Sequence, residues 1–360
     1  ARQLDAILDL AGTYNIYVIL VLHHHGLLRE SWSECPYNSA NGGPCTRPEQ
    51  FFTSERARAL VSRKLDYLCA RYASYTSLFA WELFNEADFA AYTRFEDVSA
   101  WHEEMIGRLR ASDPYGRPIA TSVGGNSWAA SIYSLPGLDF VPAHVYTPQL
   151  KHAIDILEEQ FRPLGKPVFL GEFGAFTNAA DERADHSGVY LHAGLWYSFT
   201  TPWAAASLPW WWDVHIEADD LYHHFRALAR FAAGEDRRGH NFRTVEAVLP
   251  TGRDTRAQVR GILTPSLGYL WIHDAERMAD PARPERPVVH SPATLTVDGL
   301  LGGRFRIETW NAWTGERISQ AEAASRDGRL DLPVPASAHD LAIKLKRIGV
   351  SGPTLTPGVR

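Results

Sequence analysis

The sequence predicts an α/β protein: a (β/α)8 TIM-type barrel that lacks its first two strands, followed by a C-terminal antiparallel β-sandwich. Three observations lead to this fold class. Apolar, strand-like runs alternate with amphipathic helical segments up to about residue 233, and two of those runs end on a glutamate. Beyond that point, short alternating strands are separated by Gly, Pro and Asp turns. Chemistry in α/β barrels lies where the parallel strands end.

The two strand-end glutamates are the first candidates for function. Leu78–Asp88 is an apolar run that stops abruptly at Asn85 and Glu86, and Pro167–Gly174 stops in the same way at Glu172. Two carboxyl groups whose surroundings separate their pKa values are what cleavage of a glycosidic bond requires, one as proton donor and one as nucleophile or base. The pattern therefore predicts chemistry at Glu86 and Glu172.

Six strand–helix units can be followed along the chain. Their alternation favours a parallel sheet. A doubly wound open sheet is the rival, but it would carry a glycine-rich phosphate loop after its first strand, and neither GxGxxG nor a P-loop occurs. We expect strands at 15–22, 78–86, 118–123, 139–146, 167–174 and 205–213, and helices at 1–13, 54–72, 96–111, 126–133, 154–161, 188–199 and 221–233.

The alternation stops at a charged break over residues 235–241. We therefore predict an N-terminally incomplete catalytic barrel over 1–238, a β-sandwich accessory domain over 239–348 and a tail over 349–360. The sandwich strands are expected at 244–248, 258–263, 269–273, 293–297, 305–310, 330–332 and 341–345.

Charge and composition bear on partners and location. The 360 residues carry a formal charge of -6 without a Lys/Arg block, so neither nucleic acid nor a membrane is an expected partner. Cys35 and Cys45 bracket a polar loop, and either a disulfide or free thiols fits this spacing. We expect the full-length protein to be secreted or periplasmic. A cytoplasmic location stays open, because this chain shows no signal peptide. The oligomeric state is not determined by the sequence.

The combined strand-end pattern over about residues 1–233 resembles a clan A glycoside hydrolase, cellulase-like and nearest to glycoside hydrolase family 5. The Asn-Glu pair matches the acid/base strand, and the Gly-Glu pair matches the nucleophile strand. By this resemblance the first visible strand is the third of the barrel, and the family's arginine from strand two has no counterpart. The matching residues are Asn85, Glu86, Gly171, Glu172, His23, His144, Tyr146 and a tryptophan among 210–212.

The resemblance implies a retaining β-glycoside hydrolase that cleaves a poly- or oligosaccharide by double displacement, with no cofactor and no metal. Glu86 would be the acid/base, which requires a raised pKa, and Glu172 the nucleophile. Asn85 would donate to the sugar 2-hydroxyl, and Tyr146 would hydrogen-bond Glu172. Glu82 points to the same side of its strand as Glu86 but lies deeper, so we interpret it as a buried structural carboxylate that needs a basic partner.

Further residues are expected to bind the carbohydrate. Sugar rings stack their apolar faces on aromatic planes, and Trp211 is the first choice for such a platform, with the tryptophan register ambiguous by one. The full set of expected substrate-binding residues is His23, His25, Asn85, His144, Tyr146, Trp211, Trp210, Trp32 and Asp213.

Two alternatives remain at this point. A non-catalytic carbohydrate-binding protein with a degenerate barrel would follow if the two strands are missing. A barrel metallohydrolase could use His23 and His25, which share one face of their strand in an HxH pattern. The sugar, the linkage and the choice between endo and exo cleavage are not determined by the sequence.

Overall fold

The computed structural model describes residues 1–90, 94–249, 257–275, 278 and 291–349. The chain forms two compact units. Residues 1–145 and 155–172 make up the first, and residues 146–154 together with the chain from 173 onward make up the second. Two strands, β4 (Val141–Tyr146) and β5 (Val168–Gly174), continue from the first unit into the second.

The first unit is built on parallel strands, as the alternation predicts. Strands β1 (Val18–Val21), β2 (Leu78–Glu82) and β3 (Ile119–Ala120) form one sheet in the order β1-β2-β3. Strands β4 and β5 pair with each other, and the backbone N–H of Asp139 donates to Ile119 O at 2.8 Å beside β3. Consecutive strands are thus neighbours, and polar side chains that follow them gather at one edge.

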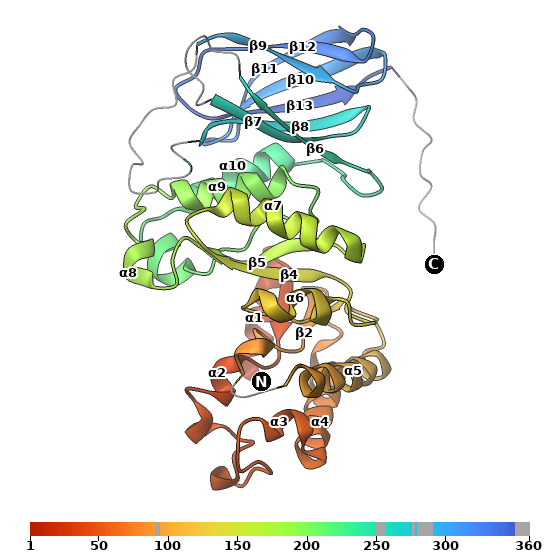
Figure 1. Cartoon of the computed structure of the whole chain (residues 1–360), viewed down its shortest axis with the longest axis vertical. Coiled ribbons are helices and arrows are strands. Elements are labelled where there is room, and N and C mark those ends of the chain that lie inside the picture. Colours follow the sequence, from red (N-terminus) through yellow and green to blue (C-terminus); the bar gives the residue numbers. More distant parts are fainter. Residues whose placement is uncertain (91–93, 250–256, 276–277, 279–290, 350–360) are drawn as a thin grey trace. The chain divides into compact units, whose positions relative to one another are not determined.

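Helices connect these strands (Figure 1). Helix α4 is capped by Ser54, whose hydroxyl accepts a hydrogen bond from Ala57 N at 3.4 Å, and it buries Val61 and Leu65. The helices up to β5 are α1 (Arg2–Thr13), α2 (His25–Leu28), η1 (Trp32–Glu34), η2 (Ser39–Asn41), α3 (Gln50–Thr53), α4 (Glu55–Tyr72), η3 (Ala87–Phe89), α5 (Phe95–Ser112), α6 (Asn126–Tyr133), α7 (Leu150–Phe161) and η4 (Arg162–Leu164).

A small apolar core lies between the strands of the first unit. Ala80, Ala120, Phe140 and Phe169 are buried together, and Ile19 packs against them. These side chains come from β1, β2, β3, β5 and the residue just before β4. These apolar side chains form a packed core next to the strand ends. This core supports the polar residues that follow the strands.

The second unit contains an antiparallel sheet of the order β11-β10-β13-β8-β7-β6 and a separate pair β12-β9. Leu270, Leu295 and Phe305 belong to one hydrophobic cluster between these two sheets, as in a sandwich. The strands are β6 (Arg243–Val248), β7 (Ala257–Leu263), β8 (Leu267–Asp274), β9 (Ala293–Asp298), β10 (Gly303–Asn311), β11 (Glu316–Ser325), β12 (Arg329–Val334) and β13 (Leu341–Arg347); its helices are α8 (Ala179–Glu182), α9 (Val189–Phe199), η5 (Trp212–Ile216) and α10 (Tyr222–Ala232).

Two elements differ from the sequence prediction. The strand expected over 205–213 is wrong, because only Pro209 forms an isolated bridge, with Phe173, and Trp212–Ile216 is a π-helix. Strand β11 was not predicted, because nearly all of its side chains are exposed and its sequence shows no apolar alternation.

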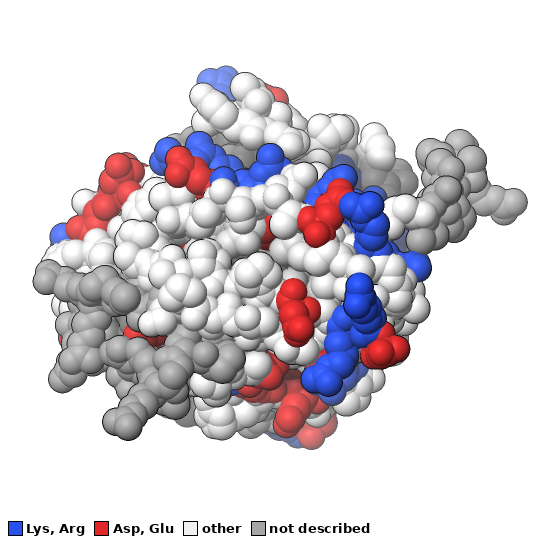
Figure 2. Space-filling view, turned by 90° about the horizontal axis from the view of Figure 1, so that it is seen from above, with Lys and Arg blue, Asp and Glu red and all other residues white. Residues whose placement is uncertain are grey.

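Other expectations stay as they were or lie outside the described residues. The predicted tail spans residues 349–360, and residues 350–360 of it lie outside the described part of the chain. The domain boundaries near residues 238 and 348 stay predictions. Cys35 and Cys45 are buried free thiols in the structure. No helix in the described part of the chain is long and apolar enough to cross a bilayer. Acidic and basic side chains are intermixed on the face shown in Figure 2.

Candidate active site

The segment after β2 places Glu86 at the strand end. Leu83 and Phe84 are fully buried, and the chain then turns so that Glu86 takes the left-handed conformation, with φ 52° and ψ 56°. A non-glycine residue in this region costs roughly 1–2 kcal/mol, so surrounding contacts must hold it. Asn85 N donates to His23 O at 2.8 Å, and Glu86 N donates to Ser122 Oγ at 3.0 Å.

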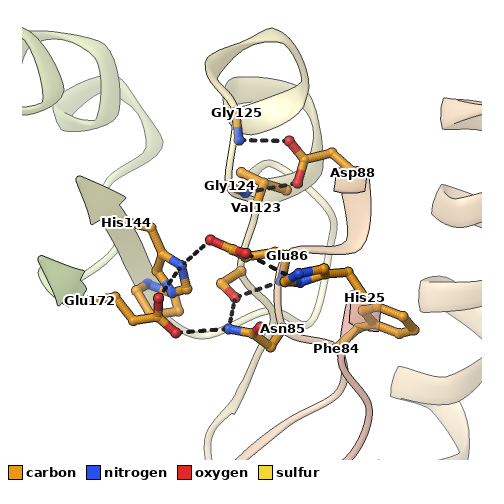
Figure 3. Close-up of polar contacts among 12 residues, drawn as sticks. His25, Phe84, Asn85, Glu86, Asp88, Val123, Gly124, Gly125, His144 and Glu172 are labelled. Carbon is orange, nitrogen blue, oxygen red and sulfur yellow. Dashed lines mark hydrogen bonds and ion pairs between the residues drawn. The ribbon is translucent and has the colours of Figure 1, made fainter. Parts of the chain in front are cut away.

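Three side chains from β4, β5 and this turn meet (Figure 3). His144 Nδ1 lies 3.0 Å from Glu86 Oε1 and 3.3 Å from Glu172 Oε2. A carboxylate oxygen of each glutamate and a ring nitrogen of His144 all lie within 4.8 Å of one another. The structure therefore brings together the two glutamates that the sequence singled out.

Two further predicted residues contact these carboxylates. Asn85 Nδ2 donates to Glu172 Oε1 at 3.1 Å, and His25 Nδ1 lies 3.2 Å from Glu86 Oε2. Glu172 thus receives the Asn85 amide on one oxygen and faces His144 with the other. Glu86 is held between the two imidazoles of His25 and His144.

The electrostatics of the site come from several buried carboxyl groups around one imidazole. Burial raises the pKa of Glu82 to about 7, and the neighbouring Glu172 and Glu86 add to the rise. Burial alone would lower the pKa of His144, but the contact with Glu86 and the charges of Glu172 and Glu82 outweigh it, so the pKa is raised. A positively charged His144 would stabilise both strand-end carboxylates.

Ser122 connects Glu82 to this group. Its buried hydroxyl donates to Glu82 Oε1 at 2.7 Å and accepts from Asn85 Nδ2 at 3.4 Å, in addition to Glu86 N. Glu82 therefore accepts a hydrogen bond from a hydroxyl group, where we had expected a basic side chain. A serine hydroxyl can do this because it donates once and accepts twice.

Comparison with known proteins identifies the family. The sequence model described as Cellulase (glycosyl hydrolase family 5) matches residues 1–212, more than half of the chain. The chain belongs to glycosyl hydrolase family 5. Among curated proteins, no sequence matches it.

Solved structures agree with the family 5 fold. A candidate glycoside hydrolase from Bacteroides vulgatus ATCC 8482 is 12% identical with a TM-score of 0.58, covering 96% of this chain and 63% of that one. A glycoside hydrolase family 5 structure from the same organism is 14% identical with a TM-score of 0.52, covering 81% and 66%. The chain spans less than two thirds of either structure. The likeness supports the (β/α)8-type fold, and the absence of two strands stays a prediction.

His23 differs from the role expected for it in a family 5 site. Its side chain is 2% exposed and is surrounded by aromatic rings, with Phe51 at 5.3 Å and Phe84 at 6.1 Å between centroids. Burial, with the nearby Lys64 ammonium, lowers its pKa well below the usual value. This position argues against direct contact of His23 with a substrate.

The burial of His23 also weakens the metallohydrolase alternative. His23 Nδ1 lies 3.2 Å from Leu83 O, and Nε2 lies 3.3 Å from Lys64 Nζ. Among the described residues, the group with the geometry to hold a metal ion is Glu86, His144 and Glu172, and it contains neither His23 nor His25. The HxH pattern does not form a metal site in this structure.

The remaining predicted residues lie elsewhere. Tyr146, Trp210, Trp211 and Asp213 belong to the second unit. Trp211 Nε1 donates to Phe176 O at 3.1 Å, which anchors this half-buried ring close to the end of β5, whereas Trp210 and Asp213 are exposed. Trp32 is half-buried in η1. Their roles in binding remain predictions.

Sequence reasoning missed two contributors to the site. Ser122 follows β3 directly, and a polar residue at a strand end is the same signal that found Asn85. Asp88 accepts hydrogen bonds from Gly124 N at 2.8 Å and Gly125 N at 2.7 Å, which fixes the loop after β3 to the turn after Glu86 (Figure 3). The Gly124-Gly125 pair can be recognised in the sequence as a turn signal. Its hydrogen-bond partner Asp88, distant in sequence, cannot.

Proposed function

We propose that this protein is a retaining β-glycoside hydrolase that cleaves a poly- or oligosaccharide by double displacement. The observation that carries the proposal is the approach of Glu86 and Glu172, with oxygens within 4.8 Å and His144 between them. Retaining glycosidases hold their carboxyl groups roughly 5–5.5 Å apart, whereas inverting enzymes leave room for a water at about 6.5–9.5 Å. Family 5 membership supports carbohydrate as the substrate.

In the proposed first step, a Glu172 carboxylate oxygen bonds to the anomeric carbon while the glycosidic C–O bond breaks. Glu86 gives its proton to the departing oxygen. In the second step, Glu86 takes a proton from water, whose oxygen replaces Glu172 at the anomeric carbon. The Asn85 amide and the His144 imidazole orient the Glu172 carboxyl group, because each contacts one of its oxygens.

A trapping experiment tests this mechanism. The protein is incubated with 2-deoxy-2-fluoro-β-glycosyl fluorides of glucose, mannose and xylose, and labelled peptides are identified by mass spectrometry. We expect the label on Glu172 and, with unmodified substrates, a first product of retained anomeric configuration by proton NMR. An inverted product, or a label on another residue, would contradict the mechanism. Binding of oligosaccharides without any product would favour the carbohydrate-binding alternative.

We further propose that an additional strand pairs with β1 in the active enzyme. Among the described residues, β1 pairs with β2 on one side only, and the exposed side chains Ile16, Tyr17 and Val21 lie at this edge. A (β/α)8 barrel has no free edge. Fusing the first two strand–helix units of a family 5 enzyme before residue 1 should raise activity. Equal activity with and without them would count against the proposal.

A further inference from the structure

We infer that Phe89 is an aromatic platform for the sugar that leaves during cleavage, an inference that rests on the proposed function. Phe89 ends η3, the short helix that follows Glu86, and its N–H donates to Glu86 O at 3.0 Å. Its side chain is 41% exposed. A large apolar ring this close to a buried polar site is open to a ligand that offers an apolar face.

The ring is held rigidly from one side. A Cβ atom at position 124 would come 2.2 Å from a ring carbon of Phe89, so only glycine lets the ring lie against this backbone. The Asp88 carboxylate fixes the same backbone through Gly124 N and Gly125 N. Little conformational entropy would therefore be lost when a ligand stacks on Phe89.

The ring also adjoins the group that holds Glu86. The rings of Phe89 and His25 lie 5.8 Å apart between centroids at 88°, and His25 Nδ1 lies 3.2 Å from Glu86 Oε2. Phe89, His25 and Glu86 thus form a continuous line of contacts. A group resting on Phe89 is positioned beside the proposed acid.

This position selects the leaving sugar over the sugar that becomes attached to the enzyme. The acid protonates the oxygen that departs, so the departing sugar lies on the side of Glu86, and the retained sugar lies over Glu172. The C–H face of a pyranose ring is the apolar surface that an aromatic ring accepts. The ligand class is therefore the reducing-end part of a β-linked oligosaccharide.

The test compares substrates with and without a leaving sugar. Phe89→Ala, Phe89→Tyr and wild type are assayed on a β-linked hexaose that the enzyme cleaves and on the matching glycosyl fluoride. We expect Phe89→Ala to lower kcat/KM for the hexaose about 3- to 10-fold more than for the fluoride, because aromatic stacking contributes about 0.5–1.5 kcal/mol. Phe89→Tyr, which keeps the ring, should restore the ratio. Equal losses on both substrates, or no loss, would overturn the inference.

A binding measurement separates this inference from the proposed function. Calorimetry with cellohexaose, mannohexaose and xylohexaose is carried out on Glu172→Gln and on Glu172→Gln combined with Phe89→Ala. We expect the second variant to bind about 3- to 10-fold more weakly, with Tyr67→Ala, which removes an exposed ring from α4, as the matched control. If wild type cleaves nothing, the proposed function fails, and this comparison still decides the platform. Equal affinity, or no binding by either variant, overturns it.

Discussion

Ionisable side chains that contact one another are arranged differently at two places, one in each unit. In the first, Glu82, Glu86 and Glu172 lie around the imidazole of His144, and the His25 imidazole also contacts Glu86. In the second, three contacts each join a carboxyl group to a basic side chain of a separate element. His192 of α9 lies 3.2 Å from Asp340, Lys344 of β13 lies 2.8 Å from Glu235, and Arg260 contacts Glu246.

The difference between these two arrangements indicates which group of ionisable residues is catalytic. A pair of opposite charges satisfies itself and fixes the packing of the elements that carry it. A cluster with more carboxyl groups than cationic groups lowers the stability of the fold, and such clusters are typical of catalytic sites. The two arrangements should therefore respond differently when one member is removed.

The largest expected effect is on activity in the first unit. Glu172→Gln and Glu86→Gln should each lower kcat/KM by about 1,000-fold or more, because each removes a group that forms or breaks bonds. The free energy of unfolding should stay the same or rise, because a carboxylate leaves a crowded cluster. Kinetics and urea unfolding measure the two quantities. Glu104→Gln on α5, an exposed position, is the control. A large loss of stability without a loss of activity would contradict a catalytic role for these two glutamates.

The next effect is on stability in the second unit. Asp340→Asn should lower the free energy of unfolding by about 1–3 kcal/mol, because it disturbs the contact between the buried His192 ring and the buried Asp340 carboxyl group. Activity per folded molecule should be kept. The control is Asp298→Asn, which breaks an exposed pair with Arg329 that contributes at most about 1 kcal/mol. A similar loss in both variants, measured by urea unfolding, would contradict the expectation.

The smallest expected effect is on the pH dependence of the free energy of unfolding. The pKa of Glu82 is about 7 in the folded protein against an ordinary value of 4.5. Between these values the unfolded chain releases the proton while the folded protein keeps it, so the free energy of unfolding falls as the pH rises. Glu82→Gln lacks this dependence. Relative to wild type, it should gain about 1–3 kcal/mol of stability between pH 4.5 and 7 in urea unfolding. A constant difference would contradict this prediction.

The sequence predicted the strand ends well, because an apolar run that stops at a charged residue has few explanations. Glu86 and Glu172 were found in this way, together with Asn85, whereas His144 was expected from the family resemblance. The run over 205–213 looked equally strand-like, yet among the described residues it forms only an isolated bridge between Pro209 and Phe173. An apolar run followed by a polar residue predicts a buried segment more reliably than it predicts a strand that pairs within a β-sheet.

Other parts of the site depend on tertiary contacts that leave no local pattern. His23 was expected beside a sugar, but the aromatic side chains of Phe51 and Trp101, distant in sequence, enclose it. Ser122 is an ordinary residue until Glu82 and Glu86 are brought to it by the fold. Phe89 becomes a candidate platform only through its position beside His25 and Gly124.

The open edge of β1 has a practical consequence for handling the protein. Among the described residues, β1 has a strand partner on one side only, and the exposed Ile16 and Tyr17 lie directly before it. Such an edge is a template on which another copy can add a strand. Copies of this chain are therefore expected to associate through β1 as the concentration rises. A lysine in place of Ile16 or Tyr17 should keep the protein dispersed, which light scattering would show directly.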